Sequence, residues 1–184
     1  MVTVALLSIL LTLTVFLAPI AYFGLLQMTA DLSHGFRTGI AGFWGAFKKH
    51  WRQALVWGLA SLGLVGPLSF GFWYFAIKPA TFSLLGLTLC GLGILFSFTI
   101  SQLTAACFFL QEPQTLRLAL KNAWALLLLQ PAYVLACGVI ALAICLVSIR
   151  YYLPIFLGVE ALLALFSILQ VQRTLGKEPD PLSV

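Results

Sequence analysis

Five long runs without a charged side chain dominate this sequence. They cover residues 1–30, 53–77, 79–111, 122–149 and 151–172, and only Glu160 interrupts the last one. A helix needs about 20 mostly apolar residues to cross a bilayer, so each run is long enough for one crossing. Two crossings and a turn would need roughly 40 residues or more, which none of the runs offers. The pattern predicts five membrane crossings.

The balance of apolar and charged residues supports the same fold class. The chain is 62% hydrophobic and 8% charged, whereas soluble domains carry about 25% charged residues. We therefore expect an all-α, polytopic transmembrane bundle with spans at about 3–26, 53–77, 81–109, 122–148 and 152–172. Residues 1–175 would form one membrane domain, followed by a loose C-terminal tail over 176–184.

The positions of the basic residues predict how the bundle is oriented. Eight of the ten Lys and Arg side chains fall in the odd-numbered connections and the C-terminal tail: Arg37, Lys48, Lys49, Arg52, Arg117, Lys121, Arg173 and Lys177. Lys78 and Arg150 lie on the other side. Because cytoplasmic loops are enriched in Lys and Arg, we expect an outside N-terminus and a cytoplasmic C-terminus. The short basic breaks between apolar runs also argue against nucleic-acid binding, which needs a broad basic face.

The cytoplasmic connection over residues 31–52 has a composition of its own. On a helix, Phe43, Phe47 and Trp51 would form an apolar stripe, with the cations on other faces. Such a helix rests in the headgroup layer, with its aromatic residues inward and its cations toward anionic lipid. A helix that docks a partner protein with the same face is the alternative. The residues assigned to this role are Phe43, Trp44, Phe47, Lys48, Lys49, Trp51 and Arg52.

A few polar and small side chains lie inside the expected spans. Glu160 is the only ionisable one well within a span; a structural hydrogen-bonding role and a transport or proton-transfer role both remain open. Gln102 and Gln130 are further intramembrane polar residues. Ser97, Ser101 and Ala105 recur every four residues, a small-residue stripe that favours close helix packing.

Proline and residues with reactive side chains complete the candidates. Pro67 and Pro131 should each kink their helix or end a half-helix. The four cysteines lie in apolar runs without metal-ligand spacing, and His34 and His50 lack neighbouring ligands apart from Asp31. There is no phosphate-binding glycine loop and no nucleophile paired with a base. We expect no enzyme, no metal and no cofactor.

Three segments resemble the YesL family of bacterial integral membrane proteins. They are "FLAPIAYFGLLQM" from Phe16, "GFWGAFKKHWRQALVWGLA" from Gly42, and "LRLALKNAWALLLLQPAYVL" from Leu116. The family pattern has a proline near the end of span one, an aromatic and basic segment entering span two, and "LKNA" opening span four. Here the chain lacks the fuller signature that follows the first proline. The resemblance implies a multi-pass protein of the bacterial plasma membrane with a role in carbohydrate uptake, and it assigns no catalytic residue.

These observations lead to one expected function and two alternatives. We expect a non-enzymatic accessory membrane protein, associated with a carbohydrate transporter through helix–helix contacts within the lipid bilayer. The first alternative is a small structural subunit of a respiratory or photosynthetic complex, in which the small-residue stripe and aromatic segment would face partners, lipid or pigment. The second is an oligomeric small-solute transporter or channel that uses Glu160.

Overall fold

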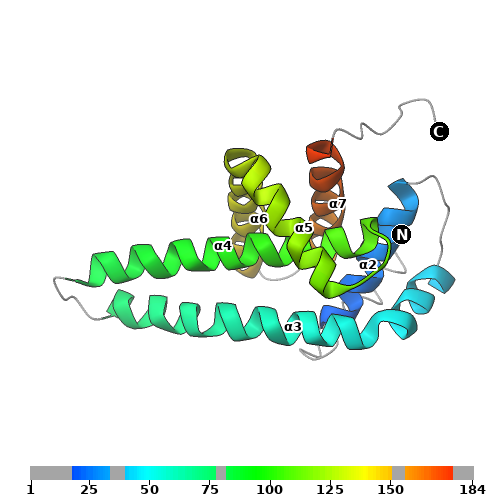
Figure 1. Ribbon diagram of the computed structural model, residues 1–184. Helices are drawn as coiled ribbons and strands as arrows, with labels where there is room; N and C mark the ends of the chain where they lie inside the picture. The colour runs from blue at the N-terminus through cyan, green and yellow to red at the C-terminus, as the bar shows by residue number, and fades with distance from the viewer. Residues whose placement is uncertain (1–17, 34–39, 78–81, 151–155, 176–184) are drawn as a thin grey trace.

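A long helical hairpin organises the molecule. The computed structural model describes residues 18–33, 40–77, 82–150 and 156–175, and every regular element within these ranges is an α-helix. The hairpin consists of α3 (Ile40–Ile77) and α4 (Ser83–Leu110), which run side by side (Figure 1). We call residues 40–64 and 96–110 its inner half, and residues 65–77 and 83–95 its outer half.

Four shorter helices gather around the inner half. They are α2 (Ala18–Ser33), α5 (Leu116–Leu129), α6 (Pro131–Arg150) and α7 (Phe156–Thr174). In Figure 1 the outer half projects past all of them, and α6 and α7 run across the hairpin rather than along it. The shape is therefore a helical cluster at one end of the hairpin and a two-helix arm at the other.

The predicted all-α class is confirmed, and the number of membrane crossings is supported only in part. Within the described residues, α3 from Gly42 and α4 have the length and apolar composition to cross a bilayer. The α5–α6 pair would be a third crossing if its two parts belong to one broken span. Residues 3–17 of the first expected span lie outside the described residues.

The buried core lies where α2, α4 and α7 meet, with contributions from the start of α3 and from α6. Its largest fully buried side chains are Phe23, Phe43, Phe108, Leu26, Leu103, Ile168, Val134 and Val171. Close approach of α2 to α3 depends on Gly24, because a Cβ at this position would lie 2.6 Å from the Phe43 ring. A glycine at this crossing therefore leaves the space that the aromatic ring fills.

Small residues also set the spacing within the outer half of the hairpin. A Cβ at Gly86 would lie 2.7 Å from the Phe75 ring, and one at Gly93 would lie 3.1 Å from Leu68. Side chains of α3 thus fill the spaces left by glycines of α4. Apolar helices pack closely in this way when small residues line their interface.

Proline 131 breaks the fourth expected span, as the sequence indicated. Because proline has no amide hydrogen and its ring clashes with the preceding turn, the helix ends at Leu129. The amide of Gln130 still donates to the Leu126 carbonyl at 3.2 Å, and α6 then leaves at 111° to α5. The expected span over 122–148 is therefore divided between two helices with a sharp bend between them. Pro67 differs, because α3 continues through it to Ile77.

The segment before the second span also differs from its expected form. We predicted a cytoplasmic connection over 31–52 with an interfacial amphipathic helix that leads into a span beginning at residue 53. Instead, α3 starts at Ile40 and runs through both segments without a break. No helix-breaking residue separates them in the sequence "FKKHWRQALVWG", so the helical hydrogen bonds continue.

Candidate functional site

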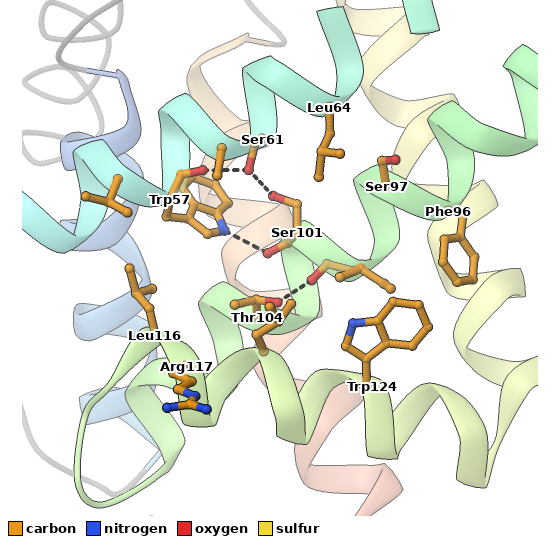
Figure 2. Close-up of a pocket in the computed structure, with 14 residues that line it drawn as sticks. Trp57, Ser61, Leu64, Phe96, Ser97, Ser101, Thr104, Leu116, Arg117 and Trp124 are labelled. Atoms are coloured by element: carbon orange, nitrogen blue, oxygen red, sulfur yellow. Dashed lines mark hydrogen bonds between the residues drawn. The ribbon is translucent and has the colours of Figure 1, made fainter. Parts of the chain in front are cut away.

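A groove between α3, α4 and α5 is the clearest candidate site. It has a volume of about 580 Å³, within the range of about 300–1,000 Å³ typical of small-molecule sites. Val56, Trp57 and Leu64 line it from α3, and Leu116, Arg117 and Trp124 line it from α5 (Figure 2). Side chains of α4 between Phe96 and Thr104 complete the lining.

Hydrogen bonds between its own walls satisfy many of the polar atoms of this groove. The indole Nε1 of Trp57 donates to the backbone carbonyl of Ser101 at 3.0 Å. The Ser61 and Ser101 hydroxyls lie 2.6 Å apart, and Ser61 also donates to the Trp57 carbonyl at 2.8 Å. Because these groups bond to one another, they join α3 to α4 and leave apolar atoms to face the cavity (Figure 2).

The three residues of the small-residue stripe have different surroundings. Ser101 lies at the contact between α3 and α4 through the bonds just described. Ala105 is fully buried, one turn further along α4. Ser97 lines the groove, one turn before Ser101. The stripe therefore serves both the helix contact and the cavity.

A polar cluster centred on Gln102 joins three helices inside the core. Its Oε1 accepts a hydrogen bond from the Tyr22 hydroxyl of α2 and a longer one, at 3.4 Å, from Ser167 of α7. Tyr22 also stacks on Trp57 of α3, with ring centroids 5.6 Å apart. A half-buried amide that accepts hydrogen bonds from two other helices links the positions of these helices.

Gln130 and Glu160 are not part of this cluster. Gln130 is exposed and caps the end of α5 at the break before Pro131. Glu160 belongs to α7, but its side chain lies outside the described part of the structure. His34 also lies outside the described residues.

The aromatic and basic segment at the start of α3 divides between the core and the surface. Phe43 is fully buried and packs against Gly24 of α2, so its assignment to a membrane-surface face is incorrect. Phe47 is half-buried, whereas Trp44 and Trp51 are exposed. The basic side chains Lys48, Lys49 and Arg52 are exposed, and Arg52 lies over the Trp51 ring at 5.2 Å. Tertiary contact with α2 decided which aromatic residues remain on the surface.

His50 is an unexpected core residue. Only 4% of it is exposed, and neither ring nitrogen has a hydrogen-bond partner among the described residues. Its ring meets Phe108 and Phe109 edge-on, with centroids 5.3 and 5.7 Å away. The imidazole therefore packs as an aromatic side chain at the end of α4.

No cluster of three or more potential metal ligands from His, Cys, Asp and Glu occurs in the part of the chain that the structure describes. Cys107 and Cys137 are buried, Cys90 and Cys145 are half-buried, and all four are free thiols.

Sequence reasoning did not find the groove, because its lining comes from three separate helices. Trp57 of α3 is far from Arg117 and Trp124 of α5 in the chain, and no spacing between them indicates that they line one cavity. The available signal was a pair of tryptophans near cations at the starts of two apolar runs. Comparison of the chain with protein-family models, curated proteins and solved structures gave no match. The fold thus defines an all-helical protein with apolar helices compatible with a membrane.

Proposed function

We propose that this chain is a non-enzymatic accessory protein of the membrane that acts by helix–helix contact with other integral membrane proteins. The observation that carries this proposal is the outer half of the hairpin, which projects beyond the other helices (Figure 1). It is apolar on nearly every side, and nothing else in the described chain covers it. Its exposed large side chains are Phe70, Phe72, Trp73, Tyr74, Ile77, Leu84, Leu85, Leu89 and Leu92.

The distribution of these side chains favours lipid and partner helices as the surroundings of the hairpin. A helix that is apolar on all sides belongs in a protein core or in a bilayer. The glycine contacts between α3 and α4 use only the facing sides of the two helices. The remaining sides of both helices are therefore available to lipid and to further helices, with which small-residue and aromatic surfaces can pack.

The part of α3 between Arg52 and Tyr74 has the length of a single bilayer crossing. Arg52 and Tyr74 are 22 positions apart in the sequence, which corresponds to about 33 Å along a helix at 1.5 Å per residue. The hydrocarbon core is about 30 Å thick. Exposed cations lie at one end of this distance, and Trp73 and Tyr74 lie at the other. Cations on the cytoplasmic side and aromatic residues at the opposite interface are the usual arrangement.

The proposal retains five spans in a bacterial plasma membrane, with the N-terminus outside and the C-terminus in the cytoplasm. The uncharged runs and the eight-to-two distribution of cations support it, and it requires α6 and α7 to turn from their position across the hairpin into line with α3 and α4. In this arrangement α5 and α6 together form the fourth span, which bends sharply at Gln130.

A carbohydrate transporter is the proposed partner, and the resemblance to the YesL family supports this choice. The experiment is gentle solubilisation of the native membrane, separation by native electrophoresis, and mass spectrometry of the band that contains this chain. We expect permease and ATPase subunits in the band. Respiratory or photosynthetic subunits would assign the chain to that machinery instead. A monodisperse single-chain band would contradict the accessory function.

A further inference from the structure

The groove between α3, α4 and α5 combines apolar walls with a basic end. Trp57 and Arg117 lie toward one end of it, whereas Leu64, Phe96 and Trp124 lie toward the other (Figure 2). The rings of Phe96 and Trp124 meet at 5.4 Å and close that second end between α4 and α5. One end of the groove is therefore basic, and the other is aromatic and apolar.

The basic end carries uncompensated positive charge. Arg117 is exposed and makes no hydrogen bond or ion pair with any described residue. Arg52 precedes the lining residue Val56 by one turn of α3. Glu112, in the turn before α5, is exposed and does not line the groove. This end is thus suited to an anion.

The interior of the groove suits an alkyl chain. Ser61, Ser101 and the Trp57 indole bond to one another, so the groove offers few unsatisfied polar atoms to hold water. From Val56 to Leu64 the α3 wall is eight positions long, or about 12 Å at 1.5 Å per residue. An acyl chain that lies along this wall would cover apolar atoms otherwise in contact with water or disordered lipid.

We propose that this groove binds one anionic phospholipid, with an acyl chain along α3 and the headgroup phosphate at Arg117. The inference rests on the membrane insertion proposed above, but it does not require a protein partner. The basic end of the groove lies next to the cations at the start of α3, which the proposed topology places at the cytoplasmic surface. A lipid headgroup at Arg117 would therefore lie at the level of the other headgroups. Guanidinium groups bind phosphate through paired, charge-assisted hydrogen bonds.

Photoaffinity labelling of the full chain tests this site. The protein is reconstituted into phosphatidylcholine vesicles that contain a trace of phosphatidylglycerol with a diazirine on one acyl chain. We expect labelling of peptides that cover residues 53–64 and 116–124 to exceed that of the outer-half peptide 83–95 severalfold. Unlabelled phosphatidylglycerol should displace the probe, whereas phosphatidylethanolamine and oleate should not. Uniform labelling, or equal displacement by oleate, would overturn the proposal.

Four variants separate the headgroup contact from the acyl-chain contact. Arg117→Gln should lower groove labelling by about tenfold, since one charge-assisted contact is lost, whereas Arg117→Lys should keep most of it. Ala60→Phe, which fills the groove, should abolish groove labelling. Ala76→Phe, on the exposed outer part of the same helix, is the matched control and should leave labelling unchanged. If neither Arg117→Gln nor Ala60→Phe changes the labelling of the groove peptides, the proposed lipid site is wrong.

The same preparation separates failure of the lipid site from failure of membrane insertion. Alkaline extraction of the vesicles is performed before labelling. If the chain is released, both the insertion and the lipid site are wrong. If the chain stays in the vesicles and its labelling is uniform, only the lipid site is wrong.

Discussion

Trp57 of α3 donates a hydrogen bond from its indole nitrogen to the Ser101 carbonyl of α4, at 3.0 Å. The same ring stacks on Tyr22 of α2. One side chain therefore links three helices at the point where the hairpin enters the helical cluster. The bond and the ring packing make separable contributions to stability.

Replacement of Trp57 should measure these two contributions. Trp57→Phe keeps a ring for stacking but removes the donor, and it should lower the free energy of unfolding by about 1 kcal/mol. Trp57→Ala also removes the packing and should cost about 3–5 kcal/mol. Denaturant titration in detergent micelles measures both, and Trp73→Phe on the exposed outer half is the control. Equal losses for the two Trp57 variants would show that ring packing contributes little.

A methyl group at Gly24 should destabilise the contact between α2 and α3. Gly24→Ala places a Cβ against the Phe43 ring, and overpacking of this kind costs about 1–3 kcal/mol. That cost exceeds the gain of up to about 1 kcal/mol from helix propensity. Thermal unfolding in detergent micelles measures this loss. Gly63→Ala, where the added Cβ meets no atom within 4 Å, is the control and should be neutral or stabilising.

A double variant tests whether the Phe43 ring is the cause. Adding Phe43→Leu to Gly24→Ala should cost less than the two single effects added together, because the smaller side chain leaves room for the methyl group. If the double variant loses as much stability as the two single variants added together, contact with the Phe43 ring does not explain the effect of Gly24→Ala.

His50 should be replaceable by an aromatic hydrocarbon. Its ring nitrogens lie buried without partners among the described residues, so His50→Phe removes an unsatisfied polar group and keeps the contacts with Phe108 and Phe109. We expect unchanged or higher thermal stability for His50→Phe. His50→Ala should lose about 1–3 kcal/mol. A large loss in His50→Phe would indicate that the imidazole has a polar role.

The two ends of the chain should lie on opposite sides of the membrane if the proposed five spans are correct, because five is an odd number. Single cysteines introduced as Thr3→Cys and Ser183→Cys, in a background with the four native cysteines replaced by alanine, should react oppositely with an impermeant thiol reagent in intact cells. We expect labelling of the first and protection of the second. Equal reaction at both ends would mean an even number of crossings, as expected if α5 and α6 enter and leave on one side.

The sequence predicted the helical class, the bounds of α4 and the end of α3, because apolar runs of this length leave few other solutions, but it did not predict the start of α3 at Ile40. It also located the break at Pro131, since the effect of proline on a helix is local. It did not locate the surroundings of Phe43 and His50, which α2 and α4 determine through contacts distant in the chain. A helical stripe in the sequence indicates which residues share a face, but not what covers that face.

The groove was beyond sequence reasoning for the same reason. Trp57, Ser101 and Arg117 meet only because α3, α4 and α5 pack together. Arg117 was used in the sequence only as a marker of orientation. Only the packing of the helices shows that Arg117 lies beside an apolar groove.

Site-specific crosslinking from the outer half of the hairpin tests the central claim most directly. A photoreactive amino acid replaces Leu85 of α4, which is 60% exposed, and in a second strain it replaces Leu128 of α5, which is 75% exposed. Irradiation of native membranes should give one discrete adduct from position 85, identified by mass spectrometry as an integral membrane protein, and no such adduct from position 128. If both positions give only the uncrosslinked chain, the outer half faces lipid alone and the accessory function is wrong.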